Sequence, residues 1–159
     1  MTNSPDDRTL ASLLDGLRIG MLGTVTPRPS SRPLTLAEVE HDTLRFLVSR
    51  DTNWIEALMI DPSVLVTFSS DEHGIYVAVA GRAELSSDRK LVQRLYIPAA
   101  DVYFDGVDDP SIAVLEVYVE SGEWWDGPSG RVGRALALAK AALTGDPDAV
   151  GDKGGVDVG

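Results

Sequence analysis

The segment of residues 44–68 constrains the fold more than any other part of this sequence. Apolar residues alternate with other side chains over residues 44–49, which predicts a strand. The cluster Arg50-Asp51-Thr52-Asn53 then predicts a helix start, because short oxygen-bearing side chains accept hydrogen bonds from the free N–H groups of a first turn. Asp61-Pro62 ends this helix, since the residue before a proline disfavours helical backbone. Residues 63–68 return as a buried strand.

The start of this helix has two interpretations. Asn53 and Glu56 have the spacing of a capping box, in which Asn53 is the N-cap and Arg50 and Asp51 are solvated surface residues. Alternatively, the exposed N–H groups and the positive end of the helix dipole bind a phosphate, with Arg50 as a bidentate partner. Helix caps far outnumber phosphate sites, so the local sequence alone favours the first interpretation.

Charge and composition exclude several classes of function. The length of 159 residues predicts one domain with a substantial core. Lys and Arg number 14 against 25 Asp and Glu, and the net charge of −11 disfavours nucleic acid or an anionic membrane as a partner. The chain has no cysteine for disulfides and no apolar run long enough to span a membrane. Acidic residues stand near the N-terminus where a signal peptide has basic ones, so we expect a cytoplasmic protein.

The other periodic segments predict a mainly β protein with peripheral helices. The remaining predicted strands are residues 19–25, 31–39, 76–85 and 112–120. The remaining predicted helices are residues 9–17, 88–96 with Ser87 as the cap, and 132–143. Six strands in meander order indicate a small antiparallel barrel or a curled sheet.

Several single residues refine this organisation. Pro33 places its strand at an edge or a bend, and Gly81 predicts a bulge. Tyr103 and Phe104 are expected to anchor an irregular acidic loop before the last strand. Residues 146–159 lack the apolar content to fold, so a flexible acidic tail is expected after a single domain of residues 1–145.

The side chains alone indicate no covalent or metal chemistry. His41 and His73 lie in polar turns without a second ligand at metal spacing. No G-x-S-x-G, G-x-G-x-x-G or G-x-x-x-x-G-K-[ST] motif is present. If the protein is an enzyme, a bound cofactor is expected to carry the reaction, and we name no catalytic residue.

Five segments in order, residues 17–25, 31–36, 45–52, 76–85 and 125–130, resemble the pyridoxamine 5′-phosphate oxidase-like FMN-binding family. The resemblance is greatest to the general stress protein branch and covers about residues 8–145. It implies a six-stranded antiparallel split β-barrel with peripheral helices, and a homodimer with FMN bound at the interface. It also implies a flavin-dependent oxidoreductase.

The resemblance assigns roles residue by residue. The segment of residues 31–34 matches the strand that lies along the flavin ring, and Ser49, Arg50 and Thr52 match the segment that receives the phosphate. Tyr76 stands near a position that touches the flavin, and Trp125 resembles an aromatic residue that approaches the ring, with the other subunit as an alternative source. The implied cofactor-binding residues are Arg32, Pro33, Leu34, Thr35, Val48, Ser49, Arg50, Thr52, Asn53, Tyr76 and Trp125.

One departure from the family pattern concerns the phosphate. The family usually begins its helix with Arg-Lys, where this chain has Asn53-Trp54. Losing two cations beside a dianion costs about 2–4 kcal/mol, or roughly one and a half to three decades in affinity. A non-catalytic homodimer with weak or absent FMN binding is therefore the alternative hypothesis. Trp54 is expected to pack under the barrel rather than stack on a ring, because large aromatic residues usually serve burial. Pyridoxamine 5′-phosphate oxidation itself is disfavoured, since the chain lacks a C-terminal Arg/His pair to grip that substrate.

Overall fold

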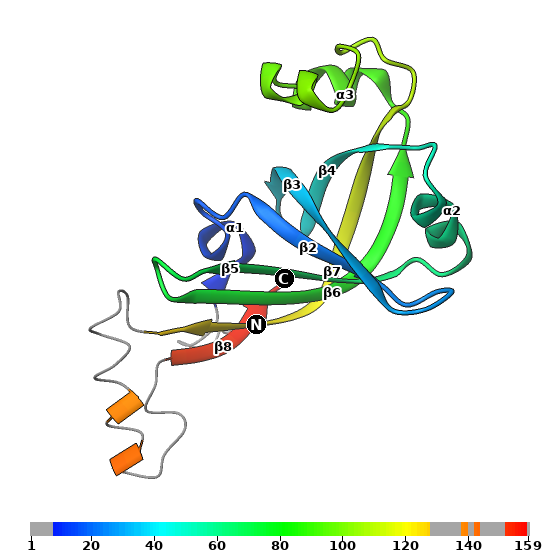
Figure 1. Cartoon of the computed structure of the whole chain (residues 1–159). Coiled ribbons are helices and arrows are strands. Elements are labelled where there is room, and N and C mark those ends of the chain that lie inside the picture. Colours follow the sequence, from blue (N-terminus) through cyan, green and yellow to red (C-terminus); the bar gives the residue numbers. More distant parts are fainter. Residues whose placement is uncertain (1–7, 128–137, 140–141, 144–151, 159) are drawn as a thin grey trace.

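A closed antiparallel barrel of six strands forms the centre of the molecule (Figure 1). The computed structural model describes residues 8–127, 138–139, 142–143 and 152–158. The barrel strands are β2 (Ile19–Thr24), β3 (Ser30–Glu40), β4 (Thr43–Ser49), β5 (Ser63–Ser70), β6 (Ile75–Ser86) and β7 (Ile112–Asp126). They follow the order β7-β4-β3-β2-β5-β6, and pairing of β6 with β7 closes the ring. The predicted six-stranded antiparallel barrel is confirmed.

The strand order is not the simple meander that the sequence predicts. Strands β2 to β4 form one three-stranded meander, and strands β5 to β7 form another. The two meanders join where β2 pairs with β5 and β4 pairs with β7. The connection from β4 to β5 runs through helix α2 (Asn53–Ile60), which Asp61 terminates as predicted.

The barrel ladder is irregular in two places, at a register shift between β6 and β7 and along the first half of β3. The register between β6 and β7 shifts at Ala80 and Gly81, and a Cβ atom on Gly81 would lie 2.1 Å from the carbonyl oxygen of Tyr118. A bulge therefore lies at the predicted position along β6, but its extra residue is Glu120 of β7, opposite Gly81. Strand β3 pairs with β4 only from Leu36 onward, so its first half has a backbone partner on the β2 side alone. Pro33 lies in that half, as the edge prediction requires.

The core fills the barrel with the inward-facing residues of each strand. Leu44, Phe46 and Val48 of β4 are buried, which confirms the predicted alternation. Strand β5 also alternates: Val66 is buried while Leu65 is 49% exposed, so the prediction of a fully buried strand is wrong. From α2, Ile55 and Leu58 are buried in this core, while α1 (Leu10–Leu13) adds two buried leucines.

The helices differ from their predicted bounds. Helix α1 is four residues long rather than nine, because Gly16 with φ +80° turns the chain away soon after it. The N-cap of α3 (Arg89–Leu95) is Asp88 and not Ser87. The Asp88 carboxylate accepts a hydrogen bond from the Lys90 N–H. After the short 3₁₀ helix η1 (Pro98–Val102), Phe104 packs against the buried cluster of Val92, Leu95, Ile112 and Val114. Tyr103 is 78% exposed, so the prediction of a second aromatic anchor is wrong.

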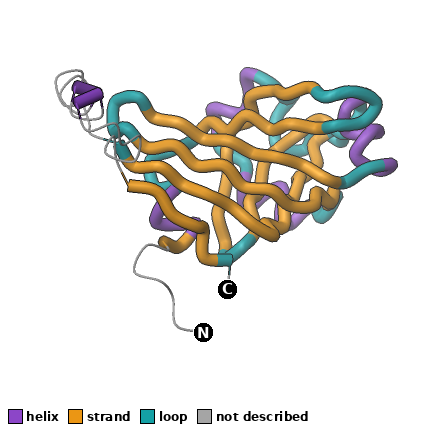
Figure 2. The backbone as a smooth tube through the Cα atoms, turned by 90° about the horizontal axis from the view of Figure 1, so that it is seen from below, coloured by secondary structure: helices purple, strands orange, loops and turns teal. Residues whose placement is uncertain are grey.

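The C-terminal segment contains ordered structure where the sequence predicts a flexible tail. Strand β8 (Asp152–Asp157) pairs antiparallel with β7, and β1 (Arg8–Thr9) pairs parallel with β8. Trp124 donates its indole N–H to the Gly155 carbonyl at 3.0 Å, and Val156 is buried. The tail prediction is therefore wrong for these six residues. Figure 2 shows the strands as one curved surface with helices at its margins. The predicted helix 132–143 lies mostly outside the described residues.

Among the described residues, no helix is both long enough and apolar enough to cross a membrane.

Candidate anion and cofactor site

The corner between β4 and α2 is built without a side-chain cap. Ser49 ends β4, and Thr52 rather than Asn53 is the N-cap of α2. The Thr52 hydroxyl donates to the Ser49 carbonyl at 3.2 Å instead of accepting from the first turn. The predicted capping box is therefore wrong, because Asn53 is already the first helical residue. An uncapped first turn leaves N–H groups available to an anion.

Arg50 lies at this corner with an unsatisfied nitrogen. Its backbone N–H donates to the Ser111 carbonyl at 2.9 Å, and its Nη2 donates to the Ile112 carbonyl at 3.4 Å. Its Nε is buried and has no hydrogen-bond partner. A second arginine, Arg89 of α3, donates to the Ile112 carbonyl at 3.3 Å and to the Val107 carbonyl at 2.7 Å. The sequence analysis missed Arg89, which lies in no motif.

Arg32 of β3 stacks on the first turn of α2. Its Cζ lies 4.4 Å from the centroid of the Trp54 ring, within the range of a cation–π contact. Its Nη2 donates to the Ser30 hydroxyl at 2.9 Å, while its Nη1 is buried without a partner. Burial lowers the pKa of Arg32. Trp54 packs partly buried against the core, as expected, and also supports this guanidinium group.

Charge at this corner is not balanced by acidic residues. No ion pair within 4.0 Å joins a carboxylate to Arg32, Arg50 or Arg89 in the part of the chain that the structure describes. All three side chains are partly buried. A group of partly buried cations with two orphaned nitrogens is chemically suited to an anion with several acceptor oxygens, such as a phosphate.

The predicted site residues fall into separate places. Arg32, Ser49, Arg50, Thr52 and Asn53 surround the start of α2. Two of the remaining residues face the core, namely Val48, which is buried, and Leu34, which is partly buried. Two others, Pro33 and Thr35, are exposed on the outer face of β3.

Tyr76 and Trp125 lie far from the α2 corner within one chain. They are opposite each other in the β6–β7 ladder and are 36% and 39% exposed. The Tyr76 hydroxyl donates to Asp71 at 3.0 Å. Tyr76 pairs with Ser69, six residues after the start of β5, which corresponds to about 20 Å along that strand. A single copy of the chain therefore does not bring the two predicted parts of the site together.

A groove with a volume of about 360 Å³ lies between α2, β6 and β7. Its lining includes the apolar residues Leu58, Met59 and Leu115 and the charged residues Arg82 and Glu84. None of the predicted cofactor-binding residues lines it. In the described part of the chain, His, Cys, Asp and Glu form no group of three that could hold a metal ion.

Comparisons with known proteins place this geometry in a family. Residues 6–148 match the sequence pattern of the family described as pyridoxamine 5′-phosphate oxidase like. General stress protein 26 of Bacillus subtilis (strain 168) is 32% identical over 114 residues, which cover 68% of this chain and 79% of that protein. The general stress FMN/FAD binding protein of Xanthomonas citri has a solved structure with a TM-score of 0.65 and 27% identity, covering 75% of this chain and 87% of that one. The general stress protein 26 of Bacillus anthracis str. Sterne shares the fold, with a TM-score of 0.66 at 20% identity over 72% of this chain and 89% of that one.

Proposed function

Because the chain belongs to the pyridoxamine 5′-phosphate oxidase-like family, in its general stress protein branch, we propose that it binds FMN and acts as a flavin-dependent oxidoreductase. The observation that carries this proposal is the pair of buried, unpartnered nitrogens, Arg32 Nη1 and Arg50 Nε, on residues that lie at an uncapped helix start. The Xanthomonas citri relative, which is named as FMN/FAD binding, supports the flavin as the ligand class.

The residues at the corner fit the phosphate of FMN. A buried donor without a partner costs about 1–3 kcal/mol, and a phosphate oxygen removes that cost. The uncapped N–H groups of α2 supply further donors and a favourable dipole. In this arrangement Arg50 and Arg32 hold the phosphate in place of the missing Arg-Lys pair, with Trp54 behind Arg32.

The free edge of β3 suits the flavin ring. From Ser31 to Thr35 the strand has backbone groups without a ladder partner on the side away from β2. Such an edge offers N–H and C=O groups to the polar rim of a flat ring, while Pro33 offers an apolar surface. The bound flavin supplies hydride transfer, and the chain supplies its binding, its orientation and the exclusion of competing reactions.

We further propose that the protein is a homodimer through the outer face of β2 and β5. Ile19, Met21, Val25 and Leu65 point outward together and are 40–55% exposed. A contiguous apolar surface of this kind marks an interaction site. In this proposal the second copy supplies its own Tyr76 and Trp125 to the first copy's α2 corner, because one chain keeps these residues apart.

Flavin titration tests the cofactor proposal. We expect FMN to quench or change its fluorescence on binding, and to bind about tenfold to a hundredfold more tightly than riboflavin, which lacks the phosphate. The Arg50→Gln variant is expected to lose about 30-fold in FMN affinity and to keep its riboflavin affinity within about twofold. Arg18→Gln, which removes an exposed arginine, is the control. A colourless protein that binds neither flavin contradicts the proposal.

Sedimentation velocity tests the dimer. Met21→Glu combined with Leu65→Glu places charges on the proposed interface and is expected to give a monomer that binds FMN poorly. Val102→Glu changes a more exposed apolar residue on η1 and is expected to leave both properties unchanged. A monomeric wild-type protein with full FMN affinity would exclude this interface.

The second candidate is a non-catalytic flavin-binding or flavin-free dimer of the same fold. Asn53 and Trp54, which replace two cations of the family pattern, favour it. The test is reduction of protein-bound FMN by NADH or NADPH under anaerobic conditions, followed by reoxidation with an electron acceptor. Turnover excludes this candidate, whereas bound flavin without turnover supports it.

A further inference from the structure

Arg89 belongs to no recognised motif, yet it meets Arg50 at a single backbone oxygen. Nη1 of Arg89 and Nη2 of Arg50 both donate to the Ile112 carbonyl, at 3.3 and 3.4 Å. The two donor nitrogens therefore cannot be further apart than the sum of these distances. Ile112 pairs with Ser49 at the end of β4, so the two cations meet where the chain turns into α2.

Neighbouring carboxylates do not neutralise this pair. Among the described residues, neither arginine has an ion pair within 4.0 Å. The pKa of Asp109 is lowered mainly by hydrogen bonds from the backbone N–H groups of Asp105 and Ser111 and from the Ser111 hydroxyl. The charge of Arg89 also lowers it, but the two side chains do not form an ion pair within 4.0 Å. On a chain with a net charge of −11, acidic residues are plentiful, and this corner is still left with unpaired cations.

A structural role explains only part of this arrangement. By donating to Val107 and Ile112, Arg89 ties α3 to the loop before β7. That role does not require a second arginine on the same oxygen, and it leaves the buried Nε of Arg50 without a partner. Two like charges at short range favour a site that an anion completes.

We propose that Arg89 is a third phosphate-binding arginine, which acts together with Arg50 on the phosphomonoester group of the bound nucleotide. This inference rests on the proposed function and extends it to α3, a helix outside the β4–α2 corner. A dianionic phosphate between the two guanidinium groups relieves their repulsion and satisfies the free Nε of Arg50. Ligand binding then also fixes α3 against the barrel.

The test compares two arginines of the same helix. Arg89→Gln removes an unpaired cation, whereas Arg94→Gln removes the same charge from an arginine that is paired with Glu38. FMN and riboflavin affinities are measured by fluorescence titration, and inorganic phosphate is tested by its effect on the melting temperature. We expect Arg89→Gln to weaken FMN about tenfold to a hundredfold with riboflavin within about twofold, and Arg94→Gln to change neither. The Arg89→Gln variant is also expected to lose the stabilisation by phosphate.

An equal loss of FMN and riboflavin affinity, or no loss of either, would overturn the inference, because it would assign Arg89 a structural role or none in binding. If Arg89→Gln does not fold, the test uses Arg89→Lys, which keeps the positive charge. The inference then requires that this variant still binds FMN more tightly than riboflavin. A wild-type protein that is stabilised by phosphate but binds no flavin contradicts the proposed function alone, and Arg89 is then judged by the phosphate shift. A wild-type protein that binds neither overturns both.

Discussion

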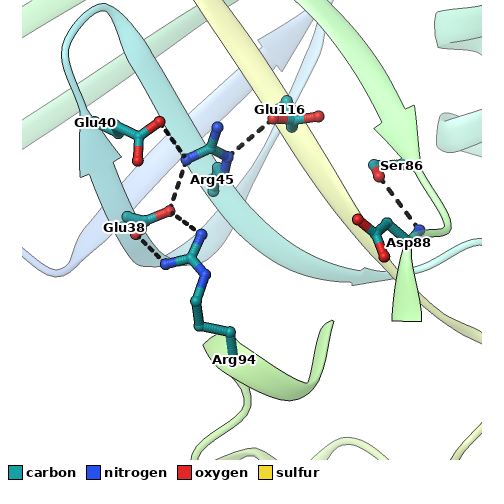
Figure 3. Close-up of polar contacts among 7 residues, drawn as sticks. All are labelled: Glu38, Glu40, Arg45, Ser86, Asp88, Arg94 and Glu116. Atoms are coloured by element: carbon teal, nitrogen blue, oxygen red, sulfur yellow. Dashed lines mark hydrogen bonds and ion pairs between the residues drawn. The ribbon is translucent and has the colours of Figure 1, made fainter. Parts of the chain in front are cut away.

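Two groups of arginines on this barrel have opposite surroundings. In the first, Arg45 of β4 donates to Glu38 at 2.7 Å and to Glu116 at 2.9 Å, and Arg94 of α3 donates to Glu38 as well (Figure 3). This paired group joins β3, β4, β7 and α3. The second, unpaired group consists of Arg32, Arg50 and Arg89, and no carboxylate of the described residues lies within ion-pair distance of them.

The difference separates a structural use of arginine from a functional one. Only 13% of the Arg45 side chain is exposed, and its carboxylate partners compensate for the loss of hydration. Both arginines of this group use two guanidinium nitrogens to bind carboxylates. The unpaired group lies in the same acidic protein but keeps donors in reserve, and it stands beside an uncapped helix start. Incomplete satisfaction therefore marks the candidate site better than charge alone does.

The largest expected effect is that substitutions in the paired group reduce stability, whereas substitutions in the unpaired group reduce FMN affinity. Arg45→Met leaves Glu116 without its ion-pair partner and leaves Glu38 with Arg94 alone, and we expect the free energy of unfolding to fall by about 3 kcal/mol. FMN affinity at fixed temperature is expected to stay within about twofold. Arg32→Met removes a guanidinium group with an unsatisfied nitrogen, so stability is expected to change by less than about 1 kcal/mol while FMN affinity falls.

Urea unfolding and FMN titration of both variants check this expectation. If Arg32→Met destabilises the protein as much as Arg45→Met does, the distinction between a structural and a functional group is wrong.

A smaller effect concerns pH and involves the paired group alone. Hydrogen bonds from Arg94 and from Arg45 lower the pKa of Glu38 from 4.5 to about 2. A carboxylate whose folded-state pKa is lowered stabilises the protein above its unfolded pKa, and this stability is lost as the pH falls from about 4.5 to about 2. After allowance for solvent screening at this site, which is 21% exposed, the loss is about 1.5 kcal/mol.

Unfolding measured between pH 5 and pH 2 tests this dependence. Glu38→Gln cannot titrate, so its stability is expected to be lower at pH 5 and to fall less steeply towards pH 2. An identical slope in the variant and the wild type would show that other carboxylates cause the acid sensitivity.

The local structure was largely predictable from sequence because its signals are local. Alternation identified β4, Asp61-Pro62 located the end of α2, and Gly81 located the bulge. The strand order was not predictable, since the pairing of Leu22 with Val66 joins residues that no short pattern relates. Strand β8 was not predicted for a different reason. Its backbone hydrogen bonds to β7 require little apolar content, and Gly154 and Gly155 have low strand propensity.

The candidate site was predictable only in part. The resemblance located Arg50 and Thr52 at the helix start, although the local rules chose the wrong cap residue. Arg89 had no signal, because an arginine in an amphipathic helix is ordinary until the fold brings it to the carbonyl of Ile112. Side-chain pairing between distant elements depends on topology, and so the balance of charge at the corner appears only in three dimensions.

The smallest expected effect sharpens the role of Trp54 in the unpaired group. The ring supports the guanidinium group of Arg32 at 4.4 Å, and a cation–π contact of this kind is worth about 0.5–2 kcal/mol. Trp54→Leu is therefore expected to weaken FMN by about fivefold, whereas Trp54→Phe keeps an aromatic face and is expected to lose less than about twofold. Because Trp54 also packs against the core, each variant is titrated well below its melting temperature, with riboflavin as the reference ligand. If Trp54 acts through Arg32 on the phosphate, the loss is confined to FMN; an equal loss for riboflavin would instead mean that the indole contacts the flavin ring or only maintains the fold.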